Sequence, residues 1–352
     1  MDIKKLLTIT TERDASDLHL TIGVPPVLRI NGKLEKLKLP ELTSQDVHEM
    51  IYSIITEKQK NNYEQFHELD FSFELENVAR FRTNIFKTRR GEAAAFRLIP
   101  ERIRSLAELN LPEELSIFTK KIKGFVLVTG PTGSGKTTTL ATLIDIINKE
   151  RYEHIITIED PIEFIHVHKN CIIDQREVGI HTNTFAGALR SALREDPDVI
   201  LVGEMRDLET ISMAVTSAET GHLVFSTLHT NSAAETVERI INVFPPHQQS
   251  QIRIQVAESL LGIVAQTLVP TLDGEGRVPA MELTIATPAI KNLIREEKIH
   301  QMPSIIQMGR KDGMLSLDQS LKNLLIDGKI SREEAIVRAI DKKSFTQIRS
   351  RF

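Results

Sequence analysis

Residues 126–140 read VLVTGPTGSGKTTTL and combine an apolar, β-branched run, a glycine-rich loop and a lysine. The loop matches the phosphate-binding pattern G-x-x-x-x-G-K-[ST]. Its glycines let successive backbone N–H groups turn toward a phosphate without Cβ clashes. The helix expected after the loop adds its positive N-terminal end. The sequence therefore predicts a strand, a nucleotide-phosphate site and a helix, in that order.

The lysine and threonine at the end of this loop predict what is bound there. Lys136 is expected to reach the β- and γ-phosphates, and the Thr137 hydroxyl to be a ligand of Mg²⁺. The expected cofactors are therefore ATP and Mg²⁺. The predicted nucleotide-binding set is Gly130, Pro131, Thr132, Gly133, Ser134, Gly135, Lys136, Thr137 and Thr138.

A single carboxylate follows a second apolar strand. In DPDVILVGEMRD, residues 196–207, the run VILV is expected to lie beside the strand that precedes the glycine-rich loop. Glu204 then lies at the carboxyl end of this strand, where α/β sheets place their ligands. It could orient an attacking water or hold Mg²⁺ through a water. The alternative is a surface glutamate after a core strand.

A third apolar strand ends in TIEDPIEF, residues 157–164. Glu159, Asp160 and Glu163 are expected to gather at the same edge of the sheet, where they could tune Mg²⁺ or position water. Equally, they could be solvated acids in a loop or at a helix N-terminus.

Two histidines flank a fourth strand in TGHLVFSTLHTNSA, residues 220–233. His229, at the carboxyl end, can donate a hydrogen bond to a γ-phosphate and report its loss. His222, at the other end, is expected to have a structural role. A structural role is also the alternative for His229.

Three arginines lie on strands expected in the N-terminal part of the chain. Arg80 and Arg82 share one face by period two, and Arg97 lies on the next strand. Arginines on strands are commonly solvated or paired with acids. The alternative is that they reach the phosphates bound by a neighbouring subunit, as arginine fingers.

The alternation of strands and helices predicts the fold class that must position these residues. From residue 122 on, strands and helices alternate, which predicts an α/β fold with a mainly parallel sheet covered on both faces. Residues 1–100 predict a smaller α+β domain, including a helix over 43–60 that Thr43 or Ser44 can cap. Residues 101–121 predict a linker. Residues 248–269 predict one amphipathic helix, and from about residue 285 the chain is expected to be helical.

Composition limits the class of protein further. The 352 residues include one cysteine, which can form no intrachain disulfide, and the net charge of −4 argues against bulk nucleic-acid binding. No window approaches 18 uninterrupted apolar residues, so no direct insertion into a membrane is expected. A cytoplasmic protein is therefore expected.

Taken together, these motifs resemble the secretion-type ATPases of type II secretion, type IV pili and related systems. TIEDPIE resembles the family's Asp box, LVGEMRD its Walker B motif and TGHLVFSTLHT its His box. The resemblance covers nearly the whole chain. The segments ASDLHL and AIKNLIRE, the latter at residues 289–296, resemble segments of the branch of the family that retracts type IV pili. That branch usually has arginine where this chain has Lys291. The short N-terminal part and the single cysteine favour the same branch.

The resemblance implies a fold and a mechanism. It implies a PAS-like N-terminal domain, a RecA-like ATPase domain and a homohexameric ring in which hydrolysis changes the interdomain angle. Glu204 would be the catalytic carboxylate, Glu163 would assist it, both near Mg²⁺, and His229 would sense the nucleotide. Arg82 and Arg97 fall where the family places N-domain arginines near the nucleotide.

The same resemblance implies partners and a location. The ring would work on an inner-membrane platform protein at the pilus base, on the cytoplasmic face, and would act on pilin indirectly. The outcome would be pilus retraction and twitching motility. Three alternatives remain: an accessory retraction paralogue, a nucleotide-gated ring in a related machine, and a DNA-processing motor. The chain has no tryptophan and only three tyrosines that could stack on bases, and this disfavours the DNA motor.

Overall fold

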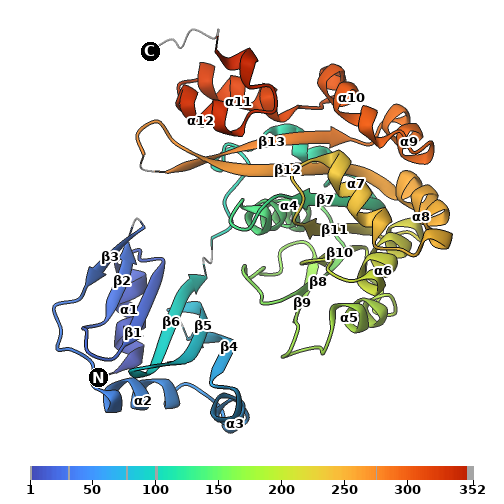
Figure 1. Cartoon of the computed structure of the whole chain (residues 1–352). Coiled ribbons are helices and arrows are strands. Elements are labelled where there is room, and N and C mark those ends of the chain that lie inside the picture. The colour runs from blue at the N-terminus through green and yellow to red at the C-terminus, as the bar shows by residue number, and fades with distance from the viewer. Residues whose placement is uncertain (1, 31, 77, 100–101, 275, 347–352) are drawn as a thin grey trace. The chain divides into compact units, whose positions relative to one another are not determined.

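The computed structural model describes residues 2–30, 32–76, 78–99, 102–274 and 276–346 (Figure 1). It divides into two compact units, Met1–Arg102 with Pro161–Ile165, and Ile103–Asp160 with His166–Phe352. Residues 100 and 101, at the predicted domain boundary, lie outside the described residues. Residues 103–121, predicted as part of a linker, group with the second unit. The role of residues 101–121 as a linker stays a prediction.

In its described residues, the first unit contains one antiparallel sheet and three helices. The sheet has the order β3-β2-β1-β6-β5-β4. The elements are α1 (Ile3–Glu12), β1 (Asp17–Thr21), β2 (Val27–Ile30), β3 (Lys33–Lys36), α2 (Ser44–Tyr52), α3 (Glu57–Phe66), β4 (Glu68–Leu75), β5 (Ala79–Thr88) and β6 (Gly91–Ile99).

The core of this unit lies between the helices and one face of the sheet. Leu7 of α1 and Ile51 of α2 pack in one cluster with Phe81 of β5 and Phe96 of β6. Because side chains alternate along a strand, the residues on either side of Phe81 point to the opposite face. That face carries the arginines predicted as site residues.

The prediction of one helix over residues 43–60 was wrong. Thr43 does cap α2 in a reciprocal capping box, as predicted, but α2 ends at Tyr52. Thr56 then forms a second capping box with Gln59 and starts α3. Two capping signals, 13 positions apart in the sequence, therefore separate two short helices.

The second unit contains a seven-stranded sheet with the order β13-β12-β7-β11-β10-β8-β9. Among the described strands of this sheet, only β12 and β13 pair antiparallel, and this confirms the predicted α/β class with a mainly parallel sheet. The elements up to the second half of the sheet are η1 (Glu113–Ile117), β7 (Gly124–Thr129), α4 (Lys136–Glu150), β8 (His154–Glu159), β9 (Ile172–Glu177), α5 (Phe185–Ala192), β10 (Val199–Val202), α6 (Leu208–Glu219) and β11 (Leu223–Leu228). The later elements are α7 (Ala233–Asn242), α8 (Pro246–Ser259), β12 (Leu260–Pro270), β13 (Arg277–Ile285), α9 (Pro288–Arg295), η2 (Ile299–Gln301), α10 (Met302–Met308), η3 (Gly309–Asp312), α11 (Leu317–Ile326), α12 (Arg332–Arg338) and η4 (Lys342–Phe345).

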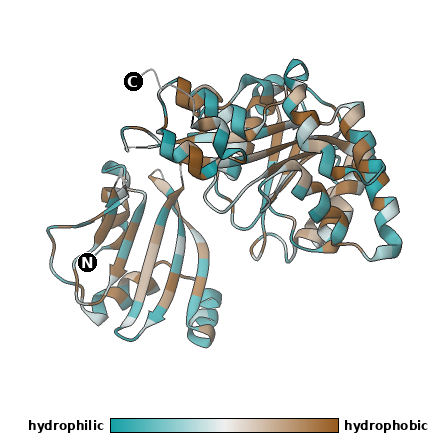
Figure 2. Cartoon of the chain, turned by 45° about the horizontal axis from the view of Figure 1, so that its top comes forward, coloured by the Kyte–Doolittle hydropathy of each residue, from teal (hydrophilic) through white to brown (hydrophobic). Residues whose placement is uncertain are grey.

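Both faces of this sheet are buried. Phe125 and Leu127 of β7 pack on one face in a cluster with α5 to α9, whereas Val126 and Val128 pack on the other face with α4 and the segment 106–118. Figure 2 shows the central strands as largely hydrophobic and the outer helices as mixed. A third cluster joins the far ends of β12 and β13 to α11 and α12. A sheet buried on both faces is rigid, so it can hold the loops at the carboxyl ends of its strands in fixed positions.

The expectation that residues 199–202 lie beside β7, the strand that precedes the glycine-rich loop, was wrong. β11 lies between β7 and β10, and it pairs in parallel with both. Alternation of strands and helices in a sequence predicts parallel pairing but not the order of the strands. The order depends on where each crossover connection places the next strand, and here the connection after β10 places β11 between β7 and β10.

The prediction of a helix over residues 248–269 was also wrong. The helix α8 ends at Ser259, and β12 runs from Leu260 to Pro270 between β7 and β13. Residues 260–265 are apolar or small, so they suit a strand buried on both faces. A Cβ at Gly262 would lie 2.3 Å from Phe118 Cζ, so this close approach needs glycine. In the described part of the chain, no helix is long and apolar enough to cross a membrane.

Candidate functional site: a phosphate loop at the carboxyl edge of the sheet

The glycine-rich loop joins the end of β7 to the start of α4. Gly130, Gly133 and Gly135 have φ values of +141°, +78° and +88°, in the region that L side chains rarely adopt. A Cβ at Gly130 would lie 2.1 Å from the backbone oxygen of Gln266 on β12. The loop therefore needs glycine at position 130 both for its conformation and for close contact with the neighbouring strand.

The side chains around the loop fit an anion. Lys136 Nζ donates to the carbonyl oxygens of Gly130 (2.8 Å) and Pro131 (3.2 Å), so its charge lies over the loop. The helix α4 has no side-chain cap at its N-terminus. Ser134 Oγ and Thr129 Oγ1 are buried and have no hydrogen-bond partner among the described residues. These unpaired donors, with the helix N-terminus and the lysine, are groups that a phosphate satisfies.

Glu204 and His229 meet at the same edge of the sheet. Glu204 follows β10 and His229 follows β11, and because these neighbouring strands are parallel their carboxyl ends coincide. His229 Nε2 lies 3.1 Å from Glu204 Oε1. Thr227 Oγ1 donates to the carbonyl oxygen of Gly203 at 2.6 Å and fixes the backbone beside Glu204. The structure thus brings together an acid and a histidine that the sequence predicted separately.

Arg206 is a member of this cluster that the sequence analysis missed. Its guanidinium donates to Glu204 Oε2 at 2.8 Å. The pKa of Glu204 is lowered, first by this hydrogen bond. Burial, the next largest effect, opposes it, and the charges of Arg206 and His229 and the contact with His229 lower the pKa further. Glu204 is therefore ionised at neutral pH, and suits orienting water or a cation better than keeping a proton. The signal in the sequence was the nearby arginine in GEMRD.

The three acids of TIEDPIEF do not form one group in the second unit. Glu159 is buried at the end of β8 and accepts hydrogen bonds from Thr157 Oγ1 (2.6 Å) and Gln175 Nε2 (3.1 Å). Asp160 is exposed. Glu163 lies in the segment Pro161–Ile165, which groups with the first unit. Among the described residues, no three His, Cys, Asp or Glu side chains are placed to hold a metal ion.

The remaining predicted residues lie apart from this cluster. His222 Nδ1 donates to the carbonyl oxygen of Ser217 at 3.0 Å, at the amino end of β11, which agrees with a structural role. In the first unit, Arg82 lies directly opposite Arg97 in the β5–β6 pair. Arg97 Nε donates to Asp17 Oδ1 at 2.9 Å. Arg97 is therefore paired with an acid of its own unit.

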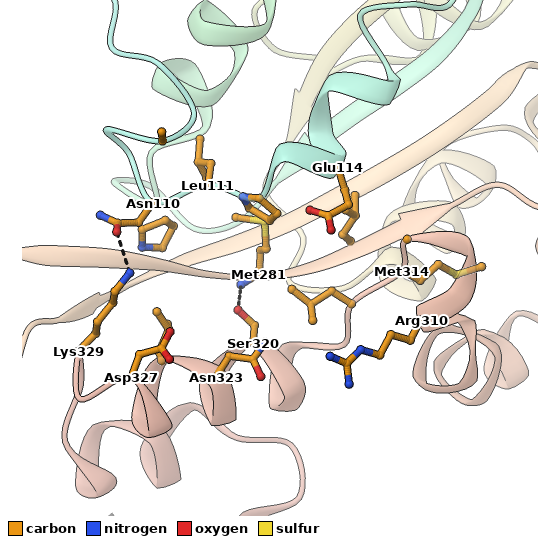
Figure 3. Close-up of a pocket in the computed structure, with 17 residues that line it drawn as sticks. Asn110, Leu111, Glu114, Met281, Arg310, Met314, Ser320, Asn323, Asp327 and Lys329 are labelled. Atoms are coloured by element: carbon orange, nitrogen blue, oxygen red, sulfur yellow. Dashed lines mark hydrogen bonds between the residues drawn. The ribbon is translucent and has the colours of Figure 1, made fainter. Parts of the chain in front are cut away.

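Three cavities are found among the described residues of the second unit, and one of them, of about 570 Å³, is lined by residues 271–273 and 328–329 among others. A second, of about 220 Å³, adjoins the loop and is lined by Pro131, Asn231, Gln266 and Arg338 among others. The third, of about 490 Å³, lies between the segment 107–114, β13 and α11 (Figure 3). Lys329 Nζ donates to Asn110 Oδ1 at 2.8 Å across its rim. None of the predicted site residues lines the cavities of about 490 Å³ and 570 Å³, so the phosphate loop is the candidate functional site.

The sheet, the glycine-rich loop after β7 and the acid at the end of β10 define a P-loop α/β protein. The chain belongs to the family described as type II/IV secretion system protein, whose model matches residues 1–314. It is 52% identical over 339 residues to the type IV pilus retraction ATPase PilT of Pseudomonas aeruginosa, covering 96% of this chain and 98% of that one. It is 40% identical over 339 residues to the type IV pilus ATPase PilU of the same organism, covering 96% and 89%. A crystal structure of the pilus retraction motor PilT with bound ADP superposes with a TM-score of 0.92 at 47% identity, covering 99% and 100% of the two chains.

Proposed function

We propose that this protein is an ATP-hydrolysing motor that powers the retraction of type IV pili. The observation that carries the proposal is the 52% identity to PilT over almost the full length of both chains. The 40% identity to PilU over the same length makes an accessory retraction ATPase the lesser candidate. The loop geometry and the Glu204–His229 pair supply the chemistry that such a motor needs.

In this proposal the P-loop holds the triphosphate. The backbone N–H groups of residues 133–137 and the N-terminus of α4 bind the phosphates, and Lys136 exchanges its carbonyl partners for the β- and γ-phosphates. Thr137, in the first turn of α4, and the carboxylates of Glu204 and Glu163 are the residues that would hold Mg²⁺. When bound there, the cation would supply positive charge to the phosphates during transfer.

Glu204 is the proposed catalytic carboxylate. Because Arg206 and His229 keep it ionised, it can orient a water for attack on the γ-phosphate. His229 shares a hydrogen-bonding contact with Glu204, so a change in the γ-phosphate would reach both side chains. Glu163 assists Glu204, and Arg82 and Arg97 stabilise negative charge on the nucleotide. These roles are proposals that follow the family's motifs.

The proposed assembly is a homohexamer at the cytoplasmic face of the inner membrane. Nucleotide turnover changes the angle between the PAS-like N-terminal domain and the RecA-like domain, and the rotating subunits work on a membrane platform protein. That protein withdraws pilin from the base of the pilus. Nucleic acid has no place in this proposal.

The experiment that tests the proposal replaces Glu204 by Gln, which keeps the shape and removes the charge. We expect hydrolysis to fall by about 100-fold or more, as when a group that acts mainly in the transition state is lost, with ATP affinity changed by less than about threefold. In cells that carry only this variant, we expect excess surface pili and no surface motility. Glu209→Gln, an exposed glutamate on α6 paired with Arg190, is the control.

Each other outcome points elsewhere. Wild-type turnover by Glu204→Gln contradicts the catalytic assignment. Cells without pili mean that the ATPase drives assembly. Unchanged piliation and motility with abolished hydrolysis mean that the protein is an accessory paralogue or belongs to another machine.

A further inference from the structure

Gln266 is a buried side chain that lies against the phosphate loop without belonging to any motif. It lies on β12 and is 4% exposed. Its Nε2 donates to the carbonyl oxygen of Ser134 at 2.7 Å, and its Oε1 accepts from Thr139 Oγ1 at 2.9 Å. One amide therefore joins the middle of the loop to the first turns of α4.

The orientation of this amide follows from its partners. The carbonyl oxygen of Ser134 can only accept a hydrogen bond, so the nitrogen of the Gln266 amide must face it. The oxygen then faces Thr139, whose hydroxyl can donate. Both ends of the amide are used, and Thr139 holds it in the orientation that presents a donor to the loop.

This contact fixes the direction of one peptide group in the phosphate cradle. In a trans peptide the C=O and the N–H of the next residue point in opposite directions. Because Gln266 holds the Ser134 carbonyl on the β12 side, the N–H of Gly135 points to the opposite side. We propose that Gln266 is a positioning residue that aims the Gly135 N–H at a bound phosphate.

The loop needs such a constraint because of its composition. Gly135 has φ of +88°, and glycine moves between positive and negative φ at little cost. Rotation of the Ser134–Gly135 peptide would replace a donor by a carbonyl oxygen, which repels phosphate. The Gln266 backbone lies against Gly130 at the other end of the loop, so this residue braces the loop at two points. The inference rests on the proposed function in one respect, that the loop binds a nucleotide.

The test is Gln266→Met, which nearly preserves volume and removes both hydrogen bonds. We expect the Kd of MgADP, and the KM of MgATP, to rise about tenfold or more, because the Ser134 carbonyl loses its partner and the cradle is no longer held. At saturating ATP, kcat should stay within about threefold, since Gln266 touches no reacting atom. Gln255→Met, which removes the hydrogen bond to Glu219 on the surface, is the matched control and should change neither constant.

Thr139 separates an orienting role from general damage to the core. Thr139→Val keeps the shape but leaves the amide free to turn, so it should weaken MgADP binding in the same direction by a smaller factor. Thr139→Ser keeps the hydroxyl and should restore affinity to near the wild-type value. Melting temperatures of all variants are measured alongside.

The outcomes distinguish this inference from the proposed function. If wild-type protein binds no MgADP, the proposed function fails. If wild-type binds but Gln266→Met binds equally well, the positioning role is wrong and the motor proposal is unaffected. If Thr139→Ser is as weak as Thr139→Val, or if affinity falls only in step with melting temperature, Gln266 has a structural role alone.

Discussion

At the scale of single residues, the charge state of Glu204 depends on the two side chains that contact its carboxylate, Arg206 and His229. Burial alone would raise the pKa of Glu204, but Arg206 and His229 contact its two oxygens and the net result is a lowered pKa. The sequence predicted Glu204 and His229 because both follow apolar strands. It did not predict Arg206 as a partner, because the turn after Glu204 brings the two side chains together and the spacing in the sequence does not show this.

The pH dependence of hydrolysis tests this pairing. Arg206→Gln removes the largest cause of the lowered pKa, so the pKa of Glu204 should rise toward its ordinary value. If Glu204 must be ionised, the acid limb of the kcat profile moves to higher pH, while activity near pH 8 changes little. The measurement is the pH profile of kcat, extended on the acid side below 4.5, the ordinary pKa of a glutamate. Arg190→Gln, which breaks an exposed pair with Glu209, should leave the limb in place, and an unmoved limb in Arg206→Gln would show that Glu204 does not titrate there.

At the scale of elements, helix ends and loops are held by single side chains. Lys291 Nζ donates to the carbonyl oxygen of Glu258 at 2.8 Å, near the end of α8, and Arg295 binds the Glu258 carboxylate at 2.7 Å. One donor suffices at a carbonyl, so lysine can fill this position within the chain. The loop after β8 is tied to α4 in the same way, by Asn148 donating to the Val167 carbonyl at 2.8 Å.

His166, in that loop, predicts a pH-dependent stability. It is 7% exposed, its Nδ1 has no hydrogen-bond partner among the described residues, and burial lowers its pKa to about 4 from 6.5. Between these values the unfolded chain binds a proton that the folded chain does not, so stability falls as pH drops from 6.5 toward 4. At pH 5 the loss relative to pH 7.5 should be about 2 kcal/mol.

Urea unfolding at pH 7.5 and pH 5.0 measures this effect. His166→Gln should lose less stability than wild-type protein over that range, even if it is less stable at pH 7.5. His300→Gln, at an exposed position, should behave as wild-type. Equal losses in wild-type and His166→Gln would mean that His166 is protonated in the folded state at these pH values.

At the scale of the whole molecule, the open question is which chain supplies the arginines. Arg82 and Arg97 belong to the first unit, and Arg97 is paired there with Asp17. Arg82 is therefore the better residue for a test of action between subunits. If it completes the site of a neighbour, a defect in one chain can be complemented by another chain.

Mixed oligomers test this. Arg82→Ala and Glu204→Gln should each be inactive alone. After subunit exchange of an equal mixture, roughly a quarter of the sites would combine an intact Glu204 with a neighbour's intact Arg82, and hydrolysis should return to about that fraction. A mixture of Lys136→Ala and Glu204→Gln is the control, because both residues belong to the same unit and no recovery is expected. No recovery with Arg82→Ala would place its role within its own chain.

The sequence by itself determined the contiguous parts of the site. The turn from β7 to α4 could be predicted because the glycines and Lys136 that form it are contiguous in the sequence. The positions of Glu204 and His229 could be predicted because each directly follows an apolar strand. The tertiary structure alone decided the strand order that puts β11 between β7 and β10, the conversion of residues 260–269 from a predicted helix to a strand, and the contact of Gln266 with Ser134. Those features depend on pairing between segments far apart in the chain, where neighbouring strands and not local preference fix the conformation.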